Sequence, residues 1–144
     1  MDHVAIMTRK LPFLQRILNG QKIIESRWYL SKRVPWNRVQ IGDTIYFKNV
    51  GDPVTVQAVI TQIEQFFDLN PLSITHLVRT KAHALGLFGH EINAFIEQNK
   101  YKKYAVFMHL ENVNLIKPFQ VNKKGFGAMS AWISVPDIKQ IVLN

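Results

Sequence analysis

The sequence has no cysteine among its 144 residues, which excludes disulfide bonds and thiolate metal sites. No apolar run approaches the roughly 20 residues of a membrane-spanning helix, and the first residues lack the basic start and apolar stretch of a signal peptide. Acidic residues are few, because 10 Asp and Glu stand against 18 Lys and Arg, giving a formal net charge of +8. We therefore expect a cytoplasmic protein that does not bind membranes and that favours polyanions such as RNA or DNA.

Histidine patterns typical of metal or nucleophile chemistry are also absent. No two of the five histidines are spaced i, i+4 on an expected helix, and Gly86 and Gly89 interrupt the seven-residue spacing of His76, His83 and His90. The sequence has no G-x-S-x-G nucleophile elbow, although a Ser-His-Asp arrangement needs only to converge in space. We expect no metal and no cofactor.

The chain length and its composition, 47% hydrophobic and 19% charged, suit a single globular domain spanning residues 1–144. Apolar patterning predicts strands over residues 4–7, 23–29, 44–49, 54–66, 104–110 and 131–135, with an interruption at 117–119. Helices are expected over residues 11–18, after the Asn70-Pro71 pair, and again around Ile92 to Ile96. Short strands with one helical insertion favour an α+β fold built on a closed or nearly closed barrel over a doubly wound sheet.

Residues 20–28, with the sequence GQKIIESRW, place three charged side chains and an indole at the start of a half-buried strand. Strand alternation puts Glu25 and Arg27 on one face and Ser26 and Trp28 on the other. Lys22 can meet Glu25 and Arg27 only if it lies before the strand or curls over its edge. The segment predicts a site that grips a base edge and a phosphate, and an ordinary surface ion pair is the alternative.

The spacing G-x-K-x-x-E-x-R, matched from Gly20 to Arg27, resembles the signature of the ASCH domain. That family belongs to the PUA-like superfamily and is associated with RNA and modified nucleosides. Residues 41–47 and 123–132 look like further parts of the family pattern. The resemblance implies a PUA-like mixed or antiparallel β-barrel with an N-terminal helix and a two-helix insertion. It also implies a cleft between the barrel strands and the late basic glycine loop.

Several residues are candidates to line such a cleft and bind nucleic acid. Aromatic rings among cations suit unpaired bases, and glycines in the late loop allow close approach of backbone to a ligand; a plain turn is the alternative there. The candidate binding residues are Lys22, Glu25, Arg27, Trp28, Tyr46, Lys48, Lys123, Lys124, Phe126, Ser130 and Trp132.

An enzyme is the alternative to a binding module. Some small ASCH proteins are amidohydrolases of N4-acetylcytidine that use the motif lysine, a threonine three positions later and a glutamate from the helical segment. Lys22 matches that lysine, but Glu25 occupies the threonine position and Glu91 is the nearest glutamate. A metal-independent ribonuclease is a second enzymatic possibility, and the catalytic candidates are Lys22, Glu25, Tyr46 and Ser130.

These observations give three hypotheses. The first is a module that binds single-stranded RNA or a modified nucleotide in a basic cleft, and the second is a hydrolase acting on RNA or a nucleoside. The third is a protein-interaction domain whose positive charge is incidental, and the sequence names no protein partner. A basic surface gathered around one hollow favours the first two over the third.

Overall fold

A computed structural model describes residues 1–143 of the chain. It contains seven strands that form one sheet, together with three α-helices and a short 3-10 helix. The strands are β1 (Asp2–Met7), β2 (Ile24–Tyr29), β3 (Thr44–Asn49), β4 (Val54–Phe66), β5 (Tyr104–Val121), β6 (Trp132–Val135) and β7 (Val142–Leu143). The helices are α1 (Phe13–Leu18), α2 (Pro71–Lys81) and α3 (Glu91–Asn99), and the 3-10 helix η1 spans Ile138–Gln140.

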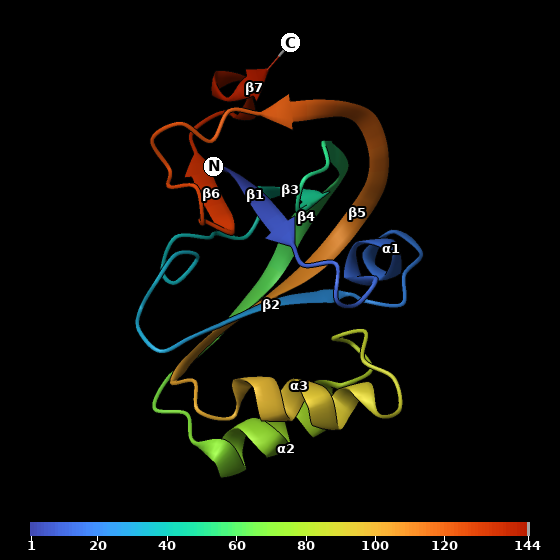
Figure 1. Ribbon diagram of the computed structural model, residues 1–144, viewed down its shortest axis with the longest axis vertical. Coiled ribbons are helices and arrows are strands. Elements are labelled where there is room, and N and C mark those ends of the chain that lie inside the picture. The colour runs from blue at the N-terminus through green and yellow to red at the C-terminus, as the bar shows by residue number, and fades with distance from the viewer. Residues whose placement is uncertain (144) are drawn as a thin grey trace.

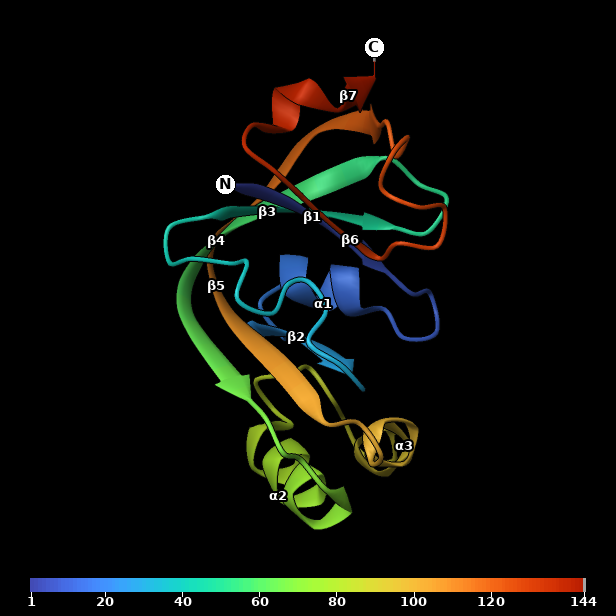
Figure 2. The same ribbon diagram turned by 90° about the vertical axis from the view of Figure 1, so that its left-hand side faces the viewer.

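The sheet has the strand order β2-β5-β4-β3-β1-β6, with β7 added beside the end of β5. The β1 and β3 strands run parallel, whereas the other neighbours are antiparallel. The long strands β4 and β5 bend along their length, so the sheet curls into a half-barrel (Figure 2). The α+β class expected from the sequence is confirmed as this mixed, curled sheet.

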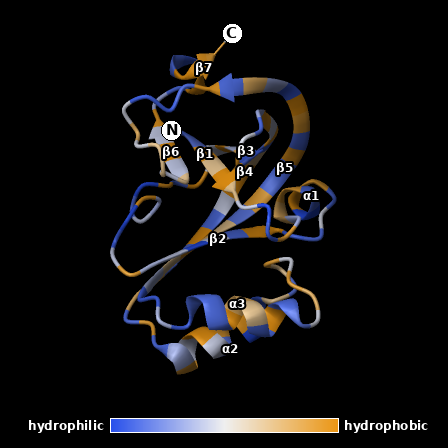
Figure 3. Ribbon diagram, viewed as in Figure 1, coloured by the Kyte–Doolittle hydropathy of each residue, from blue (hydrophilic) through white to orange (hydrophobic). Residues whose placement is uncertain are grey.

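Alternating side chains of β4 show how the sequence builds the barrel interior. Val54, Val56, Ala58 and Ile60 are buried and the residues between them are not, as a sheet with one covered face requires. Apolar residues concentrate in β1, and polar and apolar residues are mixed along the curved second part of β5 (Figure 3). The interior of the half-barrel is therefore an apolar core that holds the strand ends in fixed positions.

Helices α2 and α3 lie together beside β2 and the first half of β5, away from the half-barrel interior (Figure 1). Their apolar side chains, such as Ile74 and Ile96, pack with Trp28 and Phe107 of the sheet in a separate core cluster. Asn70 caps α2, as expected from the Asn-Pro pair. This insertion supplies one wall for the cleft described below.

The expected interruption at residues 117–119 is wrong, because β5 continues through Pro118 to Val121. Phe119 pairs with Val54 of β4, and the ladder changes register between Val54 and Val56. On its other side β5 pairs with β2 only at residues 104–109 and with β7 only at residues 120–121. Pro118 therefore falls where the strand has one neighbour, and its missing N–H removes no bond on the open side.

Within residues 1–143, no helix is both long and apolar enough to cross a membrane.

Candidate functional site

A cleft of about 1120 Å³ opens where the ends of several elements meet. Its walls come from the end of β1 and the turn after it, from β2, from α3, from the end of β3 and from the late glycine loop. Apart from the first two, these segments lie far from one another in the sequence, so only the fold brings them together. The cleft includes the motif residues Lys22, Glu25 and Arg27.

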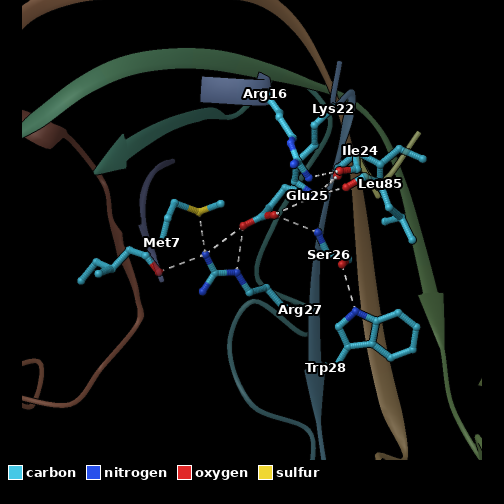
Figure 4. A network of polar contacts seen from close by, with 11 residues as sticks. Met7, Arg16, Lys22, Ile24, Glu25, Ser26, Arg27, Trp28 and Leu85 are labelled. Atoms are coloured by element: carbon cyan, nitrogen blue, oxygen red, sulfur yellow. Dashed lines mark hydrogen bonds and ion pairs between the residues drawn. The ribbon is translucent and has the colours of Figure 1, made fainter. Parts of the chain in front are cut away.

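Lys22 lies just before β2 and is almost completely buried. Its Nζ atom donates to the carbonyl oxygens of Ile24 (2.7 Å) and Leu85 (2.9 Å) and lies 3.5 Å from Oε1 of Glu25 (Figure 4). Burial lowers the pKa of this ammonium group, and the nearby Glu25 carboxylate partly opposes that shift. The position of Lys22 before the strand is one of the two that allow it to meet Glu25.

Glu25 is buried and is held from several sides at the floor of the cleft. Its Oε2 atom accepts from Nε (3.2 Å) and Nη2 (2.9 Å) of Arg27, and its Oε1 atom accepts from the backbone N–H of Ser26 (3.1 Å; Figure 4). Arg27 also donates from Nη1 to the carbonyl of Ala131 in the late loop (3.2 Å), and its guanidinium lies 5.3 Å from the centre of the Trp132 ring. The motif thus ties β2 to the late loop.

The Lys22–Glu25–Arg27 group satisfies most of its own bonding capacity, and we call it the floor cluster. An ammonium has three donors; two of those on Lys22 go to carbonyls and the third faces Glu25. Two cations share one carboxylate, so the cluster keeps a formal surplus of one positive charge, although its donors are largely occupied within the cluster and by backbone. The cluster can still accept a hydrogen bond from a ligand, because the carboxylate oxygens of Glu25 have further lone pairs.

Lys48 and Lys123 add further cationic charge beside the floor cluster. Lys48, near the end of β3, pairs in register with Ile6 of β1 and reaches the cleft although it is 9% exposed. Burial lowers the pKa of Lys48, and the positive charge of Lys123 lowers it further. Lys123 donates to the carbonyl of Ala128 (3.0 Å). Neither lysine forms an ion pair within the part of the chain that the structure describes, so an anion between them would relieve their repulsion.

Trp28 and Ser130 also line the cleft, as the sequence analysis proposed. The Trp28 ring packs edge to face on Phe95 (5.9 Å between ring centres) and Phe107 (5.5 Å), and its Nε1 atom donates to Ser26. Trp28 is therefore a core residue as well as a lining residue of the cleft. The Ser130 hydroxyl donates to the carbonyl of Trp132 (2.8 Å) and fixes the turn that follows the glycine loop.

Four predicted residues do not line this cleft: Tyr46, Lys124, Phe126 and Trp132. Tyr46 shares a face of β3 with Lys48, but it pairs with Val4 and its ring packs 5.7 Å from that of Phe119. Trp132 is buried behind Arg27. Lys124 and Phe126 are on the exposed part of the loop.

The structure adds several lining residues that were not among the candidates from the sequence. An apolar side of the cleft is formed by Leu11, Phe13 and Phe95, and further positive charge comes from Lys10 and Lys102. Arg9 also lines the cleft, but it forms an ion pair with Asp52. Paired basic residues at 9–10 and 102–103, each next to the end of a predicted element, were the available signal. The apolar residues carried no such signal, because their spacing is that of ordinary helix cores.

Glu91 is the other carboxylate among the lining residues, and it too is neutralised. Arg16 donates to its two carboxylate oxygens at 2.8 and 3.0 Å, and these bonds lower the pKa of Glu91. With Glu25 paired to Arg27 and Glu91 paired to Arg16, the cleft has a net positive lining. Within residues 1–143, Glu25 and Glu91 accept side-chain hydrogen bonds from arginines and from no hydroxyl group.

A Ser-His-Asp contact lies outside the cleft, between β1, β6 and the turn before β3. His3 is fully buried, with Nδ1 2.8 Å from the Ser134 hydroxyl and Nε2 2.7 Å from Oδ2 of Asp43. Burial lowers the pKa of His3, which favours the neutral ring, although the Asp43 carboxylate opposes this shift. No group of three or more His, Asp or Glu side chains suited to a metal ion occurs within residues 1–143.

The curled mixed sheet with its few helices is a PUA-like fold. Within that class it matches the fold of ASCH domain proteins. The ASCH protein of Zymomonas mobilis aligns with a TM-score of 0.67 and 16% identity, over 96% of this chain and 90% of that one. This confirms, at the level of the fold, the resemblance drawn from the Gly20 to Arg27 motif.

Other solved structures agree. A serine-to-alanine variant of the Zymomonas mobilis protein gives a TM-score of 0.66 and 16% identity, over 96% of this chain and 91% of that one. The N-terminal domain of Staphylothermus marinus McrB gives 0.53 and 12% identity, over 83% of this chain and 76% of that one. No protein-family model and no curated protein sequence matches the chain.

Proposed function

We propose that the protein binds single-stranded RNA, or a nucleotide within it, in the basic cleft. One observation carries this proposal: Lys48 and Lys123, from distant parts of the chain, meet in the same cleft as the buried acceptor Glu25. The neutralised carboxylates leave this cleft positively lined. The net charge of +8 favours a polyanionic ligand in the same way.

Each part of the cleft suits one part of a nucleotide. Lys48 and Lys123 would contact phosphate, because each ammonium is a compact charge with several donors. Glu25 would accept a hydrogen bond from an exocyclic amine of a base. Phe13 and Phe95 offer an apolar side against which a base can pack.

Two neighbouring lysines give a matched test of this proposal. Lys123 lines the cleft, whereas Lys124 is exposed and does not. Binding of a fluorescent single-stranded RNA, measured by anisotropy over a range of salt concentrations, should weaken steeply as salt rises. Lys123→Ala should reduce the slope of log affinity against log salt by about 0.7, the value of one phosphate contact on a single strand. Lys124→Ala should change the slope much less.

Binding that is absent or insensitive to salt in a well-folded sample would count decisively against the proposal. Equal effects of the two alanine substitutions would show that the charge acts over the whole surface and that the cleft has no special part.

Metal-independent cleavage of RNA is a second candidate, and the depressed pKa of Lys48 favours it. Because burial and the charge of Lys123 lower its pKa, the Lys48 amine is neutral more often than a surface lysine and so more available as a general base. Ser130 supplies a hydroxyl to the same cleft. Gel analysis of the same RNA after incubation with the protein in EDTA separates the two candidates. If the RNA stays intact at high protein concentration, cleavage is excluded and binding remains as the proposed function.

A further inference from the structure

Building on the proposed function, we propose that the cleft continues into a second nucleotide subsite at Tyr29 and Arg33. The ligand would then be a single-stranded RNA chain of two or more nucleotides, and a free nucleotide would occupy only part of the site. The subsite lies where β2 ends and the loop over residues 30–43 begins.

The direction of β2 leads from the floor cluster to this place. Glu25, Arg27 and Tyr29 alternate along one face of the strand, and all three line the cleft. Tyr29 lies about 7 Å beyond Arg27, since each residue of a strand advances about 3.3 Å. A ligand seated over Glu25 therefore has its next unit directed toward Tyr29.

Two cations lie over aromatic rings at the end of this path. The guanidinium carbon of Arg33 is 5.5 Å from the centre of the Tyr29 ring, and the ammonium of Lys32 is 6.0 Å from the centre of the Tyr104 ring. Tyr29 and Tyr104 are directly paired across β2 and β5, so their rings share one side of the sheet. The two rings form one platform with a cation on each.

The platform remains accessible and keeps its charge. Arg33 and Lys32 are exposed, and Tyr29 and Tyr104 are half-buried. The Trp36 ring packs edge to face with that of Tyr104, at 5.2 Å between ring centres. Neither cation forms an ion pair with any side chain among residues 1–143. Aromatic rings and guanidinium planes stack unpaired bases whatever their sequence, while the charges attract the phosphate between two units.

Lys102 makes the connection between cleft and platform continuous. It lines the cleft, and the backbone N–H of the next residue, Lys103, donates to the carbonyl of Tyr29 (2.9 Å). The segment between α3 and β5 is thus fixed beside the end of β2. A polyanion leaving the cleft here meets the charge of Lys102 in the cleft lining and that of Arg33 on the platform.

A comparison of ligand lengths tests this inference. Affinities of the wild-type protein for a ribonucleoside monophosphate and for di- and trinucleotides of the same base can be measured by calorimetry at one salt concentration. One added stacked base should tighten binding by at least about five-fold. Arg33→Ala should remove most of that gain and leave binding of the monophosphate unchanged, because Arg33 does not line the cleft.

Arg38→Ala is the matched control, since Arg38 is an exposed cation of the same loop that caps no aromatic ring. Arg38→Ala should keep the increase in affinity from the monophosphate to the di- and trinucleotides. If the monophosphate binds but the dinucleotide binds no tighter, this inference is overturned and the proposed function stands. If neither ligand binds, both fail. The second subsite would also be overturned if Arg33→Ala and Arg38→Ala reduced the affinity gained with ligand length by the same amount.

Discussion

Gly86 is the residue on which the position of Lys22 depends most directly. Its backbone has φ of +75°, and a Cβ atom added there would lie 2.6 Å from Cβ of Lys22. The preceding carbonyl, that of Leu85, accepts a hydrogen bond from the Lys22 ammonium. A glycine is therefore needed both for the backbone conformation and for the close approach of the lysine stem.

Gly86→Ala should consequently destabilise the protein more than Gly89→Ala, which serves as its control. Both glycines have positive φ, but a Cβ at Gly89 meets no atom within 4 Å. The control should lose about 1–2 kcal/mol from backbone strain alone, and Gly86→Ala should lose more because Lys22 must also move. Urea unfolding measures both losses. Equal losses would mean that the contact with Lys22 has no energetic weight.

Single residues also show what the motif could and could not predict. The meeting of Lys22 with Glu25 and Arg27 was expected only if Lys22 lay before the strand or curled over its edge. The structure meets the first condition, because β2 begins at Ile24. Tyr46 and Lys48 looked equivalent by strand alternation, yet only Lys48 reaches the cleft. The difference arises from their partners on β1, since Ile6 lines the cleft and Val4 lies in the core. That register is a tertiary property that the sequence alone did not supply.

Helix α2 is the element whose start was specified most completely by local sequence. The Asn70 side chain accepts from the backbone N–H of Ser73 (2.9 Å), and the backbone N–H of Asn70 donates to the Ser73 hydroxyl (3.0 Å). Two otherwise unpaired N–H groups at this helix start are satisfied reciprocally. The pair of residues Asn70-Pro71 was enough to predict this boundary.

Asn70→Ala should lower the free energy of unfolding by about 1 kcal/mol through loss of the cap. Asn93→Ala, on the exposed side of α3, is a matched control that should cost nothing or stabilise slightly, because alanine favours helix interiors. Thermal unfolding followed by circular dichroism measures both. A cap that contributes little would give indistinguishable midpoints.

Long strands divide into a predictable part and an unpredictable part. The bounds of β3 and β4 match the expected 44–49 and 54–66 because turns with Gly42 and Gly51 delimit them and alternation fills them. The second half of β5 was missed, because its strand character depends on pairing with β4 and β7. In this half, Pro118 indicates a break by local sequence, but pairing with the neighbouring strands keeps the segment extended.

At the scale of the whole molecule, the buried His3 joins the N-terminal strand to β6 and to the turn before β3. Its bonds to Ser134 and Asp43 link three segments that meet at one end of the sheet. The ring is kept neutral by burial, so protonation must oppose folding. Stability of the entire sheet thereby depends on the charge of one imidazole.

Stability should consequently fall as pH falls below about 6.5. The unfolded chain binds a proton at the ordinary pKa of histidine, whereas the folded pKa is lower, so acid favours the unfolded state. The stabilisation is complete above 6.5 and is lost toward the folded pKa, with a limiting slope of about 1.4 kcal/mol per pH unit. Urea unfolding between about pH 5 and pH 7.5 measures how the free energy of unfolding depends on pH around the ordinary pKa of histidine. An NMR titration of His3 measures the folded pKa.

The control is His83→Asn, which changes an exposed histidine and should leave the slope as it is. Asp43 acts in a different window. Burial would raise the pKa of its carboxyl, but hydrogen bonds from His3 and Gln40 lower it below 3.8, so its contribution is lost only in stronger acid. An NMR pKa for His3 at or above 6.5 would contradict the explanation.

The self-satisfied floor cluster has a consequence for how such a protein can diverge. The residues that hold the barrel to its loop are the buried Lys22 and Glu25 and the half-buried Arg27, which bond mainly to one another and to backbone. The side chains free to select a ligand, such as Lys10, Lys102 and Lys123, stand on turns and loops at the rim. Substitutions at the rim can therefore retune ligand preference over generations while folding stays protected, and variation should accumulate there first.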